Sequence, residues 1–204
     1  LVHGVFGRDA LPWLNNSVAF RAACVAGCAR TVQILLCLQG AHAVNVHACA
    51  SQGLRVACIL GHVNVVRILL TLKGSRAADV SVYDGAPLVA ACAHGHAATV
   101  QLLLQHRVSN VCDVHCRRGA PLRAACAGGH MDVVRLLLEA DEGASHTNES
   151  THCNNVGNDA LVAASKAGHV AIMHVLLQHR GSLAPNVPTC FEAALHSAAV
   201  HRQF

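Results

Sequence analysis

The chain has 204 residues and a formal net charge of +4, and 53% of its residues are hydrophobic although only 3% are aromatic. This scarcity of Phe, Tyr and Trp excludes a compact core built around aromatic side chains and favours thin layers of helices packed through Ala, Val and Leu. The small, scattered positive charge does not by itself indicate a nucleic-acid-binding protein. No apolar run reaches the roughly 18 residues that a membrane-spanning helix needs, so we expect no membrane contact.

One pattern of residues occurs five times along the chain, beginning at Phe20 with FRAACVAGCARTVQILL. The copies are centred on glycines spaced by 34 residues three times and then by 39, at Gly27, Gly61, Gly95, Gly129 and Gly168. In every copy the last leucine of the pattern lies nine residues after its glycine. Because the glycine and the last leucine keep the same spacing in all five copies, the pattern is an internal repeat. The chain is therefore interpreted as an array of similar units.

Each copy predicts two helices joined by a tight turn. A first helix of about eight residues ends at the glycine, which tolerates the left-handed backbone that such a turn needs. A second helix follows, with apolar residues at the i, i+3, i+4 spacing of one helical face, as in Val100, Leu103 and Leu104. Neither helix can bury its apolar face alone, so neighbouring copies must stack. The sequence therefore predicts an all-α solenoid of helix-turn-helix units.

The spacing of the copies also divides the chain. Residues 1–16 are expected to form a partial repeat or an N-terminal cap, and residues 17–191 the five repeats. Five extra residues in the fourth connector predict a longer polar surface loop at 142–159. Residues 192–204 align with the start of a sixth repeat or form a C-terminal cap. The connectors alternate apolar and polar residues before a turn, which predicts short β-hairpin or loop fingers.

The segments GAPLVAACAHGH and GAPLRAACAGGH resemble the ankyrin repeat, whose usual form is Gly-x-Thr-Pro-Leu-His, a small pair and then Gly-His. The resemblance covers about residues 17–204 and implies the ankyrin solenoid and a role in binding proteins. The family's Thr is replaced here by Ala86 or Ala120, and its His by Arg21, Arg55, Val89, Arg123 or Val162. Since that Thr and His hydrogen-bond the turn in the family, the resemblance implies a looser turn and a lower stability than in a consensus array.

Cysteine and histidine recur at fixed positions of the repeat, which raises the question of a metal site. Packed helices lie about 8–10 Å apart, whereas two thiolates on one zinc ion lie within roughly 4 Å of each other. One cysteine lies three residues before each of the first four turn glycines, and we call these residues the cysteine column: Cys24, Cys58, Cys92 and Cys126. They are therefore interpreted as small buried hydrophobic residues with free thiols. The resemblance implies that the histidine after the glycine belongs to the turn, at His62, His96, His130 and His169.

Two fingers rich in Cys and His leave a zinc-responsive module as an alternative. Residues 112–116 hold Cys112, His115 and Cys116, and residues 146–153 hold His146, His152 and Cys153. Adjacent fingers of a solenoid lie near each other, but the spacing lacks the paired Cys-x2-Cys of known zinc modules. We therefore expect neither a metal nor any other cofactor.

Catalysis has no signature in this chain. The sequence contains no phosphate-binding glycine loop, no nucleophile elbow and no His-Glu-x-x-His. The acidic residues, such as Asp132 and Glu139, are expected on exposed helix faces or in loops. We therefore expect a protein that is not an enzyme.

The predicted function is the binding of a partner protein by a scaffold or adaptor module. In ankyrin-like arrays the finger tips and the C-terminal ends of the first helices line a concave face. The resemblance places on that face Trp13, Val25, Ile59, Leu60, Tyr83, His94, Arg117, Arg118 and Lys166, with Asn15, Cys49, Asn155 and Val156 at further contact positions. Ile59 and Leu60 are two large apolar residues just before a turn, so we expect them to be partly exposed.

The proposed face predicts an apolar patch toward the N-terminus and a basic one toward the middle, which suits a partner with an acidic segment or an apolar helix. Arg117, Arg118 and Arg123 cluster, so nucleic-acid binding is an alternative. No aromatic residues interleave with these arginines, which disfavours nucleic acid. We expect a monomer in a reducing compartment, either the cytoplasm or the nucleus.

Overall fold

The computed structural model describes residues 12–38, 46–72, 82–106, 114, 116–142 and 156–186. Over these residues the chain forms ten α-helices and no strand, which confirms the all-α prediction. The helices are α1 (Pro12–Val25), α2 (Ala29–Cys37), α3 (Val46–Ile59), α4 (Val63–Thr71), α5 (Val82–Ala93), α6 (Ala97–Gln105), α7 (Cys116–Gly128), α8 (Met131–Glu142), α9 (Val156–Lys166) and α10 (Val170–Gln178). They fall into two compact units, Leu1–Asp79 with α1 to α4 and Val80–Phe204 with α5 to α10.

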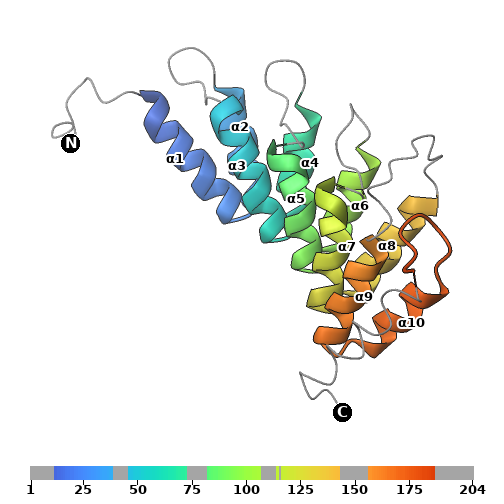
Figure 1. The fold of residues 1–204 in the computed structure, drawn as a ribbon. Helices are drawn as coiled ribbons and strands as arrows, with labels where there is room; N and C mark the ends of the chain where they lie inside the picture. The colour runs from blue at the N-terminus through green and yellow to red at the C-terminus, as the bar shows by residue number, and fades with distance from the viewer. Residues whose placement is uncertain are drawn as a thin grey trace. The chain divides into compact units, whose positions relative to one another are not determined.

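Within each unit the helices form two layers (Figure 1). In the first unit α1 packs against α3, and α2 packs against α4. In the second unit α7 packs against both α5 and α9, while α8 packs against α6 and α10. The first helices of the pairs thus form one layer and the second helices the other. Each pair buries the apolar faces that its neighbour would expose alone, as in a solenoid.

The apolar residues of the repeat form the core. The residue that opens each copy is buried, at Phe20, Leu54, Leu88, Leu122 and Leu161. The second helices direct Val and Leu into the same core, as Val65, Val66 and Leu69 do in α4. Fully burying one such side chain contributes about 1.5–3 kcal/mol to stability. The spacing of apolar residues in the sequence therefore predicted the buried faces correctly.

Each helix pair is joined by a glycine in the left-handed conformation. The five turn glycines have φ between 67° and 75°, where a residue with a Cβ is strained. After α7, the amide of Gly129 donates to the carbonyl of Cys126 at 3.4 Å, and the amide of His130 donates to the carbonyl of Ala125 at 3.0 Å. These are the two bonds of a Schellman motif, which satisfies carbonyls at a helix end. The predicted role of the glycines is confirmed.

The first helices are longer than the eight residues expected, since α1 has 14 residues and α9 has 11. In α5 and α7, part of the extra length precedes residues whose backbone is left-handed. Gly85 in α5 has φ 78°, and residues 117–119 in α7 have φ 50°, 55° and 70°. Pro87 and Pro121 lie two residues beyond these steps, near the start of the regular helix, where the N–H that proline lacks has no intrahelical partner.

Several of the expected boundaries fall near the limits of the described residues. Glu142 ends α8 and Val156 begins α9, so residues 156–159 of the expected 142–159 loop are helical. The rest of that loop, the hairpin fingers and the expected sixth repeat or cap at 192–204 lie outside the described residues. Within the described residues, no helix is long and apolar enough to cross a membrane.

Candidate functional site

Histidines of the next helix pair hold the ends of the first helices. His62 Nε2 lies 2.9 Å from the carbonyl oxygen of Val25, the last residue of α1. His130 Nε2 lies 3.1 Å from the carbonyl oxygen of Ala93, the last residue of α5. Both carbonyls belong to a last helical turn, where an intrahelical donor is missing. The structure therefore confirms a structural role for two of the histidines that follow the turn glycines, His62 and His130.

The turn glycines leave room for the histidine rings. A Cβ added to Gly27 would lie 2.6 Å from His62 Nδ1, and one added to Gly129 would lie 2.6 Å from His169 Cε1. Each ring thus occupies space that only a glycine leaves free. Within each unit the Gly-His pair therefore couples one helix end to the next and fixes the position of both.

The fixed helix ends in the first unit expose apolar side chains. Val25 at the end of α1 is 52% exposed, and Leu60 just after α3 is 44% exposed. Ile59 is half-buried, and Ala22 and Ala26 are exposed on α1 and the turn after it. The predicted partial exposure of Ile59 and Leu60 is confirmed. Val25 and Leu60 are not part of the core between the helices, so their side chains remain available for contact.

The same unit carries positive charge and no described negative charge. All eleven Asp and Glu residues of the chain lie outside residues 10–78. Arg21 and Arg55 are exposed on the first helices, and Arg30 and Arg67 are exposed on the second helices. The described part of this unit therefore offers its arginines no carboxylate partner.

In the second unit the exposed residues at the helix ends are more polar. His94 after α5 and Lys166 at the end of α9 are exposed, and the ring of His94 lies 6.2 Å from that of His96 between centroids. Arg117 and Arg118 are exposed near the start of α7, where both have left-handed backbone. The structure thus leaves the side chains of these four predicted contact residues accessible.

Arg123 of α7 meets a carboxylate of the neighbouring first helix. Its Nη1 atom lies 3.7 Å from Oδ2 of Asp159 in α9, and both side chains are nearly half exposed. An exposed pair of this kind contributes about 0–1 kcal/mol to stability. Arg123 lies six residues before its turn glycine, and Arg21 and Arg55 occupy the same position in their repeats.

The remaining predicted contact residues differ in what the structure describes. Trp13 lies in α1 and Tyr83 in α5, each described by its backbone alone, as are Asn15 and Cys49. Asn155 lies outside the described residues. Val156 is only 2% exposed, because its side chain fills the space beside Gly119. The placement of Val156 on a contact face is therefore wrong.

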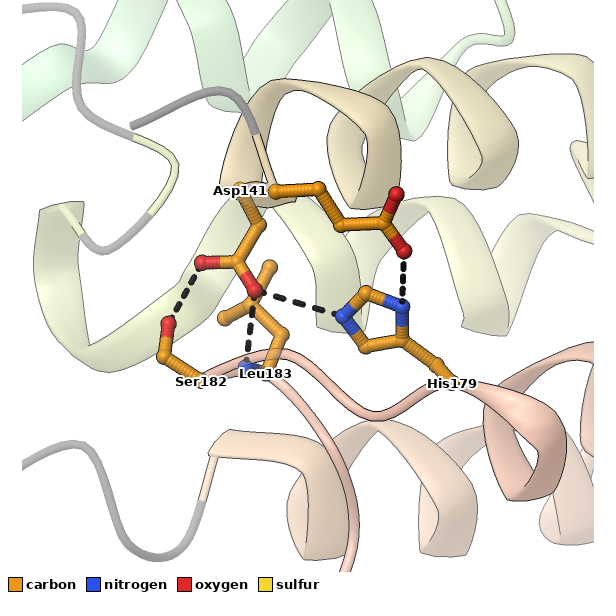
Figure 2. A network of polar contacts seen from close by, with 5 residues as sticks. Asp141, His179, Ser182 and Leu183 are labelled. Atoms are coloured by element: carbon orange, nitrogen blue, oxygen red, sulfur yellow. Dashed lines mark hydrogen bonds and ion pairs between the residues drawn. The ribbon is translucent and has the colours of Figure 1, made fainter. Parts of the chain in front are cut away.

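A buried acidic cluster was not predicted from the sequence. Asp141 of α8 is 1% exposed, although its acidic character suggested an exposed face or a loop. Figure 2 shows its carboxylate facing the segment after α10. Oδ2 accepts a hydrogen bond from the amide of Leu183 at 3.1 Å and lies 3.2 Å from His179 Nε2, while Oδ1 accepts from the hydroxyl of Ser182. The carboxylate therefore ties the segment after α10 to α8.

The chemistry of this cluster favours an anchor over a catalytic site. The Ser182 hydroxyl donates its proton to Asp141, whereas a nucleophilic serine gives its proton to a histidine base. His179 Nδ1 also faces Glu142 Oε1 at 3.3 Å, so both ring nitrogens are directed at carboxylates. Three groups that converge on one buried carboxylate satisfy its need for donors.

The cysteine column is buried, as predicted. Cys24, Cys58, Cys92 and Cys126 are all 0% exposed. Burial raises the pKa of the Cys126 thiol to about 12, so this thiol is neutral at physiological pH and is a poor metal ligand. No group of three or more metal-ligating side chains occurs among the described residues. Of the two Cys/His-rich fingers, only Val114 and Cys116 belong to that portion of the chain.

A comparison with protein families agrees with the repeat pattern. The profile of the family described as ankyrin repeats (3 copies) matches residues 19–116 and 108–189. Among solved structures, the crystal structure of the human ASB11 ankyrin repeat domain is similar, with 20% sequence identity and a TM-score of 0.44, covering 87% of this chain and 96% of that chain. A comparison with curated proteins finds no match. Ankyrin repeats are generally protein–protein interaction modules and typically non-enzymatic scaffolds. Since the profile spans most of the sequence, the chain belongs to the ankyrin-repeat family.

Proposed function

We propose that this chain is a scaffold or adaptor module that binds a partner protein through the exposed ends of its first helices. The observation that carries the proposal is the exposure of Val25 and Leu60, 52% and 44%, at helix ends that glycine turns and a histidine hydrogen bond hold in place. Large apolar side chains on a rigid, accessible surface are typical of interaction sites.

Rigidity is the second part of the proposal. Ordering one flexible side chain on binding costs about 0.5–1.5 kcal/mol, and ordering a loop adds to that cost. The bond from His62 to the Val25 carbonyl positions the end of α1 before a partner arrives, so much of this cost falls on folding and not on binding. The chain then acts as a binding module and not as an enzyme.

The proposed contact residues extend beyond this pair. We include Ile59 in the first unit and His94, Arg117, Arg118 and Lys166 in the second, whose described side chains are all at least partly exposed. Trp13 and Tyr83 are included because they occupy contact positions of the ankyrin repeat. We propose a monomer that works in the cytoplasm or the nucleus without a cofactor.

The test is capture of partner proteins from a cell lysate with Leu60→Asp. A charged residue at the centre of an apolar contact is expected to weaken capture by about tenfold or more. The matched control is Leu177→Asp in the second helix α10, because Leu177 is the same residue type and is 45% exposed. Captured proteins are identified by mass spectrometry, and circular dichroism establishes that both variants keep the helical content of the parent.

The proposal predicts a protein held by the parent and by Leu177→Asp but lost by Leu60→Asp. Equal retention by both variants, or a loss confined to Leu177→Asp, would contradict the use of the first-helix ends. The pair Val25→Asp and Ile34→Asp repeats the comparison within the first unit, since Val25 ends a first helix and Ile34, 65% exposed, lies in a second helix.

A further inference from the structure

The first helices of the first unit place two arginines and an apolar patch on one accessible surface. Arg21 and Val25 are four residues apart in α1, and Arg55 and Ile59 are four residues apart in α3, so each pair shares one side of its helix. Leu60 follows directly. We call these five residues the α1–α3 face. All are exposed except Ile59, which is half-buried.

Close packing of α1 and α3 brings the two halves of this face together. A Cβ added to Gly53 of α3 would lie 3.0 Å from the ring of Phe20 in α1 and 3.1 Å from Cys24 Sγ. The missing side chain lets the two helices approach within the usual interaxial distance of about 8–10 Å. Arg21 and Arg55 both lie six residues before their turn glycines, so they stand at the same level of neighbouring helices.

A carboxylate occupies the corresponding place in the second unit. Arg123, at the same position of the repeat, has Asp159 of the neighbouring first helix 3.7 Å away. Among the described residues no carboxylate pairs with Arg21 or Arg55, and residues 10–78 contain no acidic side chain. Two exposed guanidinium groups that lack a carboxylate of their own suit a ligand that brings carboxylates with it.

The surroundings of the arginines favour a protein over a nucleic acid. Single-stranded nucleic acids are held by basic grooves with aromatic side chains on which the bases stack. Phe20, the one Phe, Tyr or Trp whose side chain is described in this unit, is fully buried. Beside the arginines lie the aliphatic side chains of Val25 and Leu60, which gain from contact with apolar side chains and offer nothing to a phosphate.

We propose that the α1–α3 face binds an acidic, amphipathic segment of a partner protein. Carboxylates of the segment pair with Arg21 and Arg55, in the way that Asp159 pairs with Arg123, and its apolar side chains cover Val25 and Leu60. Carboxylates at i and i+7 of a partner helix lie about 10.5 Å apart, which matches the separation of two packed helices. This inference rests on the proposed function and names the partner class of the same surface.

The test selects ligands for the full-length chain from a random peptide library displayed on phage. The selected peptides are expected to be enriched in Asp and Glu together with Leu, Ile and Val. Their affinity is measured for Arg21→Glu/Arg55→Glu and for the control Arg30→Glu/Arg67→Glu, which makes the same charge change on the exposed faces of the second helices α2 and α4. The first variant should lose about tenfold or more in affinity, and the control should stay within about threefold of the parent.

Four outcomes overturn the inference. Selection of neutral or basic peptides contradicts the acidic partner, and equal losses in the two charge variants contradict the α1–α3 face. Failure to select any peptide, combined with tight binding of a labelled single-stranded RNA that Arg21→Glu/Arg55→Glu abolishes, would assign the face to nucleic acid. Failure to select any peptide without RNA binding also overturns the proposal.

The variant Leu60→Asp separates this inference from the proposed function. If the selected peptides lose affinity for Leu60→Asp but bind Arg21→Glu/Arg55→Glu as they bind the parent, the helix ends bind proteins and the acidic partner is wrong. If neither variant affects binding, the proposed function through the first-helix ends falls together with the inference.

Discussion

Gly95 is crowded in two ways, by its own backbone and by a neighbouring ring. Its φ is 73°, and a Cβ at this position would lie 2.7 Å from His130 Cε1. Left-handed backbone costs an alanine about 1–2 kcal/mol, and displacing the ring breaks the bond from His130 to the Ala93 carbonyl, which contributes about 1 kcal/mol. We expect Gly95→Ala to lower the free energy of unfolding by about 2–3 kcal/mol, measured by urea denaturation.

A second background separates the two contributions. In a His130→Ala chain the ring is absent, so Gly95→Ala should cost the backbone term alone, about 1–2 kcal/mol. If Gly95→Ala lowers the free energy of unfolding equally in the two backgrounds, the position of the His130 ring does not require a glycine at position 95.

Cys126 makes the stability of the protein depend on alkaline pH. In the unfolded chain its thiol ionises with a pKa of 9.0, and in the folded protein burial raises that pKa to about 12. Between these values the unfolded state releases a proton that the folded state keeps. The free energy of unfolding should therefore fall as the pH rises through this window, by up to about 1.4 kcal/mol per pH unit. The effect fades as the pH falls below 9.

The comparison with Cys126→Ala isolates this thiol from other titrating groups. Urea denaturation at about pH 8 and about pH 10.5 should show a larger loss of stability in the parent than in Cys126→Ala. If both proteins lose the same free energy of unfolding over this interval, the ionisation of Cys126 is not linked to folding.

At the scale of the element, Asp141 joins α8 to the segment that follows α10. Asp141→Ala leaves His179, Ser182 and the Leu183 amide without their shared acceptor. Leaving a buried donor such as the Leu183 amide without its acceptor costs about 1–3 kcal/mol. We expect faster hydrogen exchange of the Leu183 amide and a lower stability of the second unit. Glu142→Ala is the control, because Glu142 is 65% exposed at its side chain, and unchanged exchange at Leu183 in Asp141→Ala would refute the anchor.

The helices and their turns were predictable from the sequence because each depends on residues close together in the chain. The glycines, the apolar positions of the second helices and the buried cysteines all recur in one register, and local spacing determines which side of a helix they occupy. The exposure of Ile59 and Leu60 followed from the same register, since they precede a turn glycine.

The errors concern contacts between residues far apart in the sequence. The partners of Asp141 lie 38 to 42 residues away, in the segment that follows α10. Val156 follows the connector that has five extra residues, so counting along the repeat gave it the wrong environment. Its burial depends on the space that Gly119 leaves free, which no local pattern shows.

At the scale of the whole molecule, charge is divided unevenly along the chain. The acid-free stretch 10–78 covers most of the first unit, whereas in the second unit Arg123 pairs with Asp159. The second unit thus neutralises part of its charge internally. The first unit leaves its arginines beside exposed apolar helix ends, which makes it the stronger candidate for partner recognition.

The most direct test of the central claim, that the ends of the first helices contact a partner protein, is site-specific photocrosslinking. A photoreactive phenylalanine derivative replaces Leu60 in one protein and Leu177 in another, and both are irradiated in a lysate. We predict a crosslinked protein from position 60, identified by mass spectrometry, and none from position 177. Crosslinks from position 177 alone, or the same crosslinks from both positions, would contradict the claim.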